Sequence, residues 1–398
     1  MSQPIRVGLV GAGFAARFHL RGLERVYGVP VQIAGVTARS AASREKFSQE
    51  TGVPAFASFD ALCDGVDVVD LCTPPVTHEE FAVSAFQRGK HVIIEKPFTG
   101  YFGDGSPEFR GNTFSKENML QHALASCERI LSAARASGRT LCYAENWIYA
   151  PAIQKEREIV AKSGAQILWM LGNQSHSGSH SPYYGQWRHS GGGSLVGKGC
   201  HPLSAALYLK RVEGETRDGR PIRPATVSAR THEITRLPGY RDEGLLRRGY
   251  QDVEDYAQVH ITFSDGAIAD IFASELMLGG VSNWLEVIGN NHRTKCNLNP
   301  TNALETFNPR EDALRDVYVT EKIETKQGWS NPASDEAWQH GYPQEFQDFM
   351  ESIAHRRAPL ATADLARDTM VALYAAYRSA ERGGAEVEIP ASPIVAPE

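Results

Sequence analysis

The chain has 398 residues, of which 42% are hydrophobic and 22% are charged, and its formal net charge at pH 7 is −6. This composition is typical of a soluble globular protein with two domains, and the acidic balance argues against a nucleic-acid partner. Strand-forming residues begin at Ile5 without a secretory leader, and no apolar stretch could span a bilayer, so we expect a cytoplasmic protein that does not bind membranes.

The cysteines are scattered along the chain without the spacing of metal ligands or of redox pairs. We therefore expect reduced thiols, no disulfide and no bound metal. The residues are Cys63, Cys72, Cys127, Cys142, Cys200 and Cys296.

Short β-branched runs alternate with helical stretches in the first third of the chain. The runs 5–10, 32–36, 66–71 and 91–95 predict strands. Strands that alternate with helices are typical of a parallel α/β sheet. We expect residues 1–145 to form such a domain and to bind a dinucleotide.

The loop after the first strand reads Gly11-Ala12-Gly13-Phe14-Ala15-Ala16. Gly11 permits a tight turn, Gly13 lets the backbone approach a pyrophosphate, and the following helix offers free N–H groups. The position directly after a strand favours a cofactor loop over a plain turn. We expect Gly11, Gly13, Phe14 and Ala15 to contact the cofactor.

The second strand lacks the acidic residue that commonly binds the ribose of NAD. Its end reads Val36-Thr37-Ala38-Arg39-Ser40. Arg39 could meet the 2′-phosphate of NADP, stack on the adenine of NAD, or be a solvated arginine. NAD and NADP both remain open.

Lys96 follows the apolar strand that ends at Glu95 and precedes Pro97. Open α/β sheets bind ligands at the carboxyl ends of their strands, so this lysine would lie close to a nicotinamide ring. Lys96 is the leading catalytic candidate. The glycine-rich segment 99–114 follows it and is either a lid or a solvated insertion.

From Asn146 the pattern changes to longer strands joined by turns, including 256–263 and 267–274. This pattern predicts a largely antiparallel sheet, and residues near the end of the chain recur at helical spacing. We expect a second domain over 146–388, followed by a Pro-rich tail over 389–398 that forms an extended arm or a frayed terminus.

Four motifs of the first domain together resemble the Gfo/Idh/MocA superfamily of sugar and inositol oxidoreductases. They are Gly11-x-Gly13, Cys72-Thr73-Pro74-Pro75-x-x-His78, Gly89-Lys90-His91 and Glu95-Lys96-Pro97. The resemblance implies an N-terminal Rossmann domain with a doubly wound parallel sheet. It also implies a C-terminal α/β domain whose large, mostly antiparallel open sheet is often used in homo-oligomers.

The same resemblance extends the set of cofactor contacts to the end of the third and fourth strands. It implies contacts from Thr73, Pro74, His78, Glu95, Lys96 and Pro97, and a cis peptide bond before Pro97.

Residues 191–201 resemble the second signature of the family, a glycine run that leads to a catalytic histidine, here His201. Gly197 stands where members commonly carry an aspartate, and Ser204 stands where a second aspartate is usual. We therefore expect His201 to lack its usual carboxylate partners and to lie beside Lys198 in an otherwise uncharged neighbourhood.

Oxidation of a secondary alcohol requires a base for the hydroxyl proton while hydride leaves the same carbon. Lys96 and His201 are assigned to this chemistry jointly. Either could be the base, because burial or a nearby cation such as Lys198 can lower the pKa of a lysine.

The segment Ile159–Val212 contains no Asp or Glu but several basic residues, which suggests an anionic substrate. Lys162, Lys210 and Arg211 are interpreted as solvated, and Arg247 and Arg248 as part of an exposed loop without a role. The predicted substrate contacts are Asn146, His176, His180, Tyr183, Tyr184, Trp187, Arg188, Lys198 and His201. The aromatic members would pack on a pyranose, although Asn146 lies in a hinge segment whose neighbours Trp147 and Tyr149 could be purely structural.

The favoured function is net dehydrogenation of an anionic sugar. The alternative is a redox-neutral glycosidase, for example for sulfoquinovosides, in which NAD or NADP regains its hydride and is retained through turnover. A non-catalytic sugar sensor is the third class, and the presence of both Lys96 and His201 argues against it.

Overall fold

The structure is a computed structural model, and it describes residues 3–179, 181, 183–299 and 304–391. Five parallel strands form the first sheet in the order β2-β1-β3-β4-β5. Their bounds are β1 Ile5–Val10, β2 Val31–Thr37, β3 Val68–Leu71, β4 His91–Glu95 and β5 Leu141–Ala144. The predicted parallel sheet is confirmed, and the four strands predicted from periodicity start and end within two residues of the observed ones.

Helices connect these strands as the alternating pattern predicts. They are α1 Phe14–Leu23, α2 Ala41–Thr51, α3 Phe59–Gly65, α4 His78–Gln87 and α5 Lys116–Ser137. The strand order reverses between β1 and β3, which is where a doubly wound sheet leaves a crevice for a ligand. The loops that begin at Gly11 and Cys72 flank this point.

The second sheet has seven strands in the order β11-β10-β6-β9-β8-β7-β14, and only β6 and β9 pair in parallel. The predicted, mostly antiparallel sheet is therefore confirmed. The strands are β6 Ile167–Ser175, β7 Pro224–His232, β8 Tyr256–Phe263, β9 Ile268–Ser274, β10 Ser282–Gly289, β11 Arg293–Asn297 and β14 Val387–Glu388. Residues of β8 alternate between buried and less buried, so one face of this sheet packs on the core.

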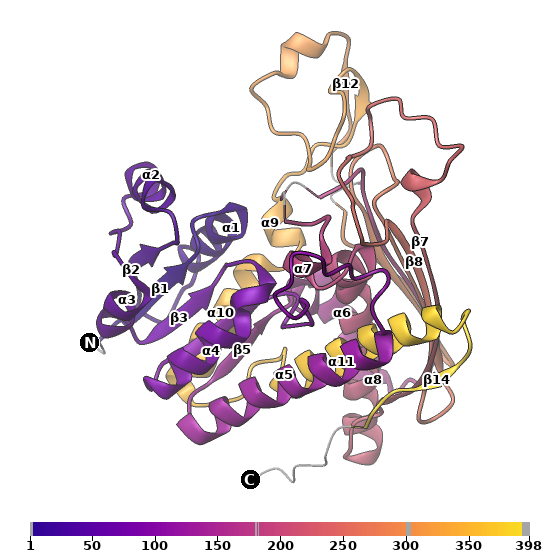
Figure 1. Ribbon diagram of the computed structural model, residues 1–398, viewed down its shortest axis with the longest axis horizontal. Helices are drawn as coiled ribbons and strands as arrows, with labels where there is room; N and C mark the ends of the chain where they lie inside the picture. The colour runs from indigo at the N-terminus through magenta and orange to yellow at the C-terminus, as the bar shows by residue number, and fades with distance from the viewer. Residues whose placement is uncertain (1–2, 180, 182, 300–303, 392–398) are drawn as a thin grey trace.

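Helices α6 Pro151–Ser163 and α8 Cys200–Asp218 belong to the second half of the chain, and α8 packs on the sheet through β6. Two further strands, β12 Thr306–Asn308 and β13 Gly328–Ser330, pair with each other in a projecting segment (Figure 1). The short helical elements are η1 Pro75–Thr77, η2 Asn146–Tyr149, α7 Trp187–Ser190, η3 Leu195–Gly199, η4 Ile234–Arg236, η5 Glu311–Leu314 and α9 Glu336–Gln339.

The last two long helices, α10 Tyr342–His355 and α11 Ala363–Glu381, return to the first sheet. Helix α10 packs on α1, and α11 packs along α5 (Figure 1). The contact between α1 and α10 is close, because a Cβ added at Gly22 would lie 2.4 Å from the ring of Phe346. At the beginning of the predicted tail, Ile389 is buried and its N–H donates to Ala225 O, whereas residues 392–398 lie outside the described part.

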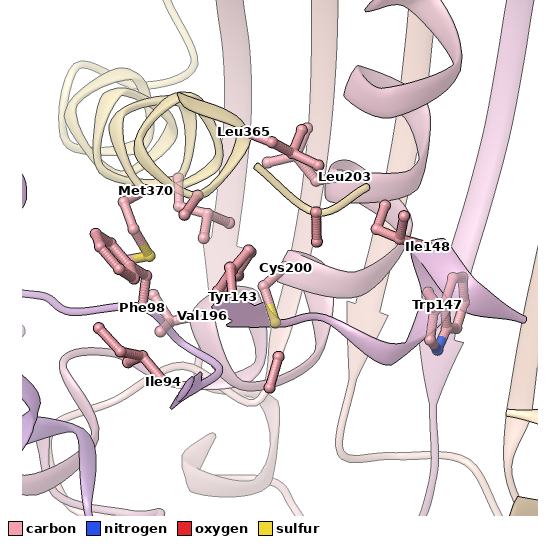
Figure 2. Packing of buried hydrophobic residues seen from close by; sticks show 14 of the residues in the cluster. Ile94, Phe98, Tyr143, Trp147, Ile148, Val196, Cys200, Leu203, Leu365 and Met370 are labelled. Atoms are coloured by element: carbon pink, nitrogen blue, oxygen red, sulfur yellow. The ribbon is translucent and has the colours of Figure 1, made fainter. Parts of the chain in front are cut away.

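One apolar cluster joins the two sheets at the site of interest. Figure 2 shows Ile94, Tyr143, Cys200 and Met370 within it, so β4, β5, α8 and α11 contribute together. Each of these four side chains is fully buried. Tight packing of this cluster fixes the segments that carry Lys96 and His201 relative to one another.

All six cysteines are buried free thiols. Within the described ranges, none of the helices combines the length and the apolar character that a transmembrane segment needs.

The expectation that Lys210 is solvated is wrong. Its side chain is 0% exposed, and its ammonium group lies 2.6 Å from Glu213 Oε2 and 2.7 Å from Asp265 Oδ2. Lys162 and Arg211 are also expected to be solvated. Lys162 is exposed, whereas Arg211 is partly buried against Glu215. Lys210 is buried because the buried carboxylate of Glu213 requires a positive charge beside it.

Replacing Lys210 with methionine should lower the free energy of unfolding by about 3 kcal/mol, because Glu213 and Asp265 both lose the buried ammonium group, although Glu213 keeps its ion pair with Arg217. Denaturant unfolding measures this loss. Lys162→Met is the matched control: that lysine is 77% exposed in its pair with Glu158 and should change stability by less than about 0.5 kcal/mol. Equal stability of the two variants would contradict the expected effect.

Candidate active site

Lys96 lies directly after β4, and its Nζ donates a hydrogen bond to Gly197 O at 3.2 Å. This contact joins the first sheet to the glycine signature of the second half of the chain. Burial lowers the pKa of Lys96, but the acidic groups of Tyr184, Cys200 and Glu95 raise it more, and the pKa ends above its ordinary value. Of the two candidate bases, Lys96 is therefore disfavoured, because its pKa is raised and not lowered, and it is a cation at neutral pH.

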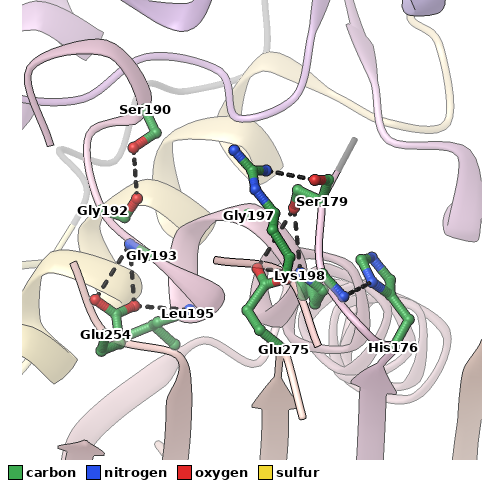
Figure 3. Close-up of polar contacts among 12 residues, drawn as sticks. His176, Ser179, Ser190, Gly192, Gly193, Leu195, Gly197, Lys198, Glu254 and Glu275 are labelled. Carbon is green, nitrogen blue, oxygen red and sulfur yellow. Dashed lines mark hydrogen bonds and ion pairs between the residues drawn. The ribbon is translucent and has the colours of Figure 1, made fainter. Parts of the chain in front are cut away.

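The glycine signature forms a turn that leads into the π-helical segment η3. A Cβ at Gly193 would lie 2.0 Å from Glu254 O, so only glycine fits there. The carboxylate of Glu254 accepts hydrogen bonds from the N–H groups of Gly193 and Leu195 (Figure 3). It also accepts a hydrogen bond from the hydroxyl of Tyr377. Burial raises the pKa of Glu254 to about 7. This buried carboxylate holds the turn that presents Gly197 O to Lys96.

His201 lies in the first turn of α8, with its Nδ1 2.5 Å from Glu145 Oε1. The indole ring of Trp147 stacks beside the imidazole, with 5.8 Å between ring centroids. The expectation of an uncharged neighbourhood without a carboxylate partner is therefore wrong. Glu145 comes from the end of β5, on the strand next to that of Lys96.

The protonation of His201 follows from these neighbours. Burial lowers the pKa of His201, the carboxylate of Glu145 opposes this, the cation of Lys96 adds to it, and the pKa ends below its ordinary value. The imidazole is thus neutral at pH 7. With the Nδ1 proton directed at Glu145, the Nε2 lone pair is free to accept a proton, since Nε2 has no hydrogen-bond partner among the described residues.

Lys198 is not a free cation. It forms an ion pair with Glu275, both side chains are 2% exposed, and its Nζ also lies 3.4 Å from Ser179 Oγ (Figure 3). The other departure from the family pattern, Ser204, is buried against the hydroxyl of Thr369 at 3.0 Å and belongs to the core.

The first loop has the shape that a dinucleotide requires. Gly11 adopts φ +115°, and a Cβ there would lie 2.6 Å from Cys72 O. A Cβ at Gly13, by contrast, would meet no heavy atom within 4 Å, and no side chain caps the start of α1. Phe14 is 58% exposed at this helix terminus, and Ala15 is partly buried beside it. The open N-terminus of α1 therefore fits a pyrophosphate.

The other predicted cofactor residues differ in exposure. His78 is fully buried, with Nε2 3.0 Å from Thr73 O and Nδ1 3.1 Å from Pro97 O, so it is not a direct cofactor contact but fixes two loops. Pro74 is partly buried in the loop that His78 fixes. The predicted cis peptide bond between Lys96 and Pro97 is confirmed.

Two of the predicted cofactor contacts, Glu95 and Arg39, are charged residues at the ends of different strands. Glu95 Oε1 lies 3.7 Å from His19 Nε2 and is mostly buried, whereas Arg39 is exposed just beyond the end of β2. Arg39 therefore has room to contact a nucleotide at the edge of the sheet, whereas Glu95 contacts His19 of α1.

The predicted substrate residues fall into two groups. Tyr184 lies against Gly197, where a Cβ would be 3.2 Å from its ring, so it is beside Lys96. Asn146 is buried near His201, and its amide donates to His340 O at 2.7 Å. His176 accepts from the N–H of Gly178 at the edge of the same region.

Three further predicted substrate residues, Trp187, Arg188 and Tyr183, contact residues other than Lys96 and His201. Trp187 is 2% exposed, and its indole N–H donates to Tyr101 O, so its ring is part of the core and not a sugar platform. Arg188 donates to Pro107 O, and Tyr183 packs edge-on against His189. His180 lies outside the described residues.

Segment 99–114 is docked and is not a solvated insertion. Tyr101 stacks on Phe114 and His122, and the N–H of Gly111 donates to Asp252. The indole of Trp187 closes over this segment. The segment is therefore anchored to its surroundings through Tyr101, Phe109 and Gly111, while several of its other residues are exposed.

Two buried groups carry metal-ligand atom types close together among the described residues. They are Glu145, Cys200 and His201, and His19, Asp70 and Cys72. A histidine–carboxylate contact accounts for each group, because His19 Nδ1 lies 2.9 Å from Asp70 just as His201 meets Glu145. Hydrogen bonding explains both arrangements without an ion.

Known protein families match two separate segments of the chain. A model described as an oxidoreductase family with an NAD-binding Rossmann fold matches residues 5–106, and a GFO/IDH/MocA C-terminal domain model matches residues 166–294. The UDP-N-acetylglucosamine 3-dehydrogenase of Acidithiobacillus ferrooxidans is 40% identical over 24% of this chain and 29% of that protein. The glucose-6-phosphate 3-dehydrogenase of Bacillus subtilis is 30% identical over 23% of this chain and 26% of that protein.

The matches to these two enzymes thus span less than a third of the length of either. Similarity of fold extends much further. The crystal structure of GenD2 from gentamicin A biosynthesis in complex with NAD is 24% identical and covers 98% of both chains, with a TM-score of 0.78. The two-sheet arrangement described above is therefore shared with that protein over nearly its whole length.

Proposed function

Because the chain belongs to the Gfo/Idh/MocA oxidoreductase family, we propose that it is an NAD-dependent enzyme that oxidises a ring secondary alcohol of a sugar. The main support for the proposal is the proximity of Lys96 and His201. They are distant in the sequence, and the contact of Lys96 with Gly197 O supports their assignment to one site. A cation and a neutral imidazole side by side suit alcohol oxidation.

When bound, NAD supplies the acceptor for the hydride of the alcohol carbon. His201 Nε2 takes the hydroxyl proton while Nδ1 stays hydrogen-bonded to Glu145, whose carboxylate stabilises the imidazolium that forms. The ammonium group of Lys96 donates to the alcohol oxygen as negative charge develops there. The carbon–oxygen double bond forms as proton and hydride leave, and Tyr184 beside Lys96 lines the approach to this oxygen.

The proposed substrate is an anionic sugar. The two enzymes named above act, by their names, on a nucleotide sugar and on a sugar phosphate, both of which carry phosphate. The basic residues of segment 159–212 add little to this argument, because Lys162, Lys198, Lys210 and Arg211 each pair with a carboxylate from outside the segment. We also propose a homo-oligomer assembled through the open face of the seven-stranded sheet, on which Leu168 is 44% and Trp169 38% exposed.

The redox-neutral glycosidase is the second candidate. Glycine at position 197, in place of the carboxylate that members commonly carry, favours a changed contact with the sugar hydroxyls. In the glycosidase reaction the hydride returns to the sugar, and the cofactor is retained through turnover.

The test is to incubate the protein with neutral and anionic sugars and glycosides, including a sulfoquinovoside, at limiting NAD or NADP. Reduced nicotinamide, oxidised sugar and released aglycone are measured together. Reduced cofactor in proportion to oxidised sugar supports the dehydrogenase, whereas many aglycones released per cofactor support the glycosidase. Sugar binding without either product would contradict both and favour a sensor.

We propose that Arg39 contacts the adenosine half of the cofactor at the edge of the sheet and favours NADP over NAD. Arg39→Ala should weaken NADP binding about tenfold or more, the effect of losing one charge-assisted hydrogen bond to a phosphate, and should change NAD binding much less. Dissociation constants measured by fluorescence titration test this, with the exposed Lys46→Ala as the control. Unchanged affinity for both nucleotides would remove Arg39 from the site.

A further inference from the structure

Three cations from separate parts of the chain meet at the short segment 177–179, which follows β6. The guanidinium of Arg247 donates to Ser179 O, Lys322 Nζ donates to Gly178 O at 2.5 Å, and Lys198 Nζ lies 3.4 Å from Ser179 Oγ. We refer to Lys198, Arg247 and Lys322 as the cation cluster. The sequence predicts no role for Arg247, and no motif points to Lys322.

The geometry of this segment is fixed by the approach of Arg247. The N–H of Arg247 donates to Ser177 O at 2.9 Å, and a Cβ at Gly178 would lie 2.2 Å from Arg247 Cβ. Gly178 also has φ +127°, so any other residue would force the arginine away. Lys322 itself adopts φ +62°, a conformation that costs a lysine energy and is often found where residues clamp a ligand.

The cluster carries more positive charge than its neighbours neutralise. Lys198 and Glu275 form a buried pair at its base, which leaves Arg247 and Lys322 as the partly exposed cations, with Glu321 beside Lys322. Burial lowers the pKa of Lys322 to about 8, and the charges of Lys198 and Arg247 contribute to this while Glu321 and Glu275 oppose it. Such mutual repulsion is relieved when an anion binds.

The cation cluster is adjacent to the catalytic pair. Gly197 accepts the hydrogen bond of Lys96, and the next residue is Lys198. The charge of Lys96 also contributes to the lowered pKa of Lys198, after burial, which lowers this pKa most. Figure 3 shows Gly197, Lys198, Ser179 and Glu275 together in this region. A group bound at Arg247 and Lys322 would belong to the molecule being oxidised.

We propose that Arg247 and Lys322 bind an oxyanion substituent of the sugar substrate, a carboxylate or a phosphate, above the Lys198–Glu275 pair. This inference rests on the proposed function for its statement that the anion is part of a sugar. Each cation uses one N–H group on the backbone of 177–179 and retains further donors for the anion.

Binding is tested first without any turnover, on the full chain. Sodium sulfate should raise the melting temperature of the wild type in a saturable way relative to sodium chloride at equal ionic strength. Lys322→Gln and Arg247→Gln should each raise the apparent dissociation constant of sulfate about tenfold or more. Arg248→Gln is the matched control, because that neighbouring side chain is 71% exposed and pairs with Asp242.

Since Arg247 also supports the backbone, Arg247→Lys serves as a second variant that keeps the charge and should recover part of the sulfate affinity. A wild type without a saturable sulfate response, or variants that respond as the wild type does, would overturn the inference. These outcomes do not depend on whether any sugar is oxidised.

Kinetics then identify the anion. UDP-N-acetylglucosamine, glucose 6-phosphate and glucuronate are compared with neutral glucose. KM for the phosphate-bearing sugars, or for the carboxylate-bearing one, should rise about tenfold in Lys322→Gln with little change for glucose. An equal rise for glucose, or the same selective rise in Arg188→Gln instead, would contradict the assignment. Failure to oxidise any sugar would count against the proposed function only.

Discussion

Replacing Lys96 with methionine is expected to lower kcat by about 10²–10⁴-fold, because the alcohol oxygen loses the cation that stabilises its developing charge. Methionine keeps most of the volume of the side chain, so the fold should persist. The pH dependence of kcat/KM should also differ between this variant and the wild type. The charge of Lys96 helps to lower the pKa of His201, and without it that pKa rises.

The direction of the pH effect follows from the role of His201 as base. The base must be neutral, so activity is present above its pKa and is lost as pH falls through it. In Lys96→Met the acidic limb of the residual kcat/KM should therefore move to higher pH. Lys90→Met is the control, because Lys90 lies at the opposite end of β4, where it donates to Val66 O. Wild-type turnover in Lys96→Met would exclude the proposed mechanism.

The second large effect is expected for Glu145→Gln. The carboxylate of Glu145 orients the imidazole of His201 and stabilises it when it is protonated, so kcat should fall on the order of 10²–10⁴-fold. Glu145 also raises the pKa of His201. Its removal should shift the acidic limb to lower pH, which is opposite to the shift expected for Lys96→Met.

A matched control for this substitution exists elsewhere in the chain. Glu156 is buried and lies 2.7 Å from His292 Nε2, so Glu156→Gln breaks a similar histidine–carboxylate pair outside the site. It should reduce thermal stability without moving the pH profile. If both variants shifted the profile alike, or if Glu145→Gln left it unchanged, Glu145 would have only a structural role.

The parts of the molecule that follow from local sequence were predictable. Strand β4 and the loop from Gly11 to Ala15 carry their signals within a few residues, because strand periodicity and the need for glycine are local properties. The turn at Ser264–Gly266 joins the predicted strands β8 and β9 for the same reason. Lys96 could be identified because its position at the end of a parallel strand is itself the functional signal.

The parts that depend on long-range packing were not predictable. The contact of Glu145 with His201 spans 56 residues and requires β5 and α8 to be packed against each other. A polar residue at the end of a parallel strand was the only signal for Glu145. The partners of Lys198 and Lys210 were hidden in the same way, since one charged residue in a sequence gives no sign of which distant carboxylate will cover it.

The return of the last helices to the first sheet has a consequence for synthesis of the chain. Helices α10 and α11 pack on α1 and α5, and the ring of Phe346 fits against Gly22. The last strand of the five-stranded sheet ends at Ala144, about two hundred residues before α10 begins at Tyr342, so the sheet leaves the ribosome with apolar surface uncovered. Chaperone binding should therefore be strongest during elongation between β5 and α10, and a premature stop before residue 342 should yield an aggregation-prone product rather than a nucleotide-binding fragment.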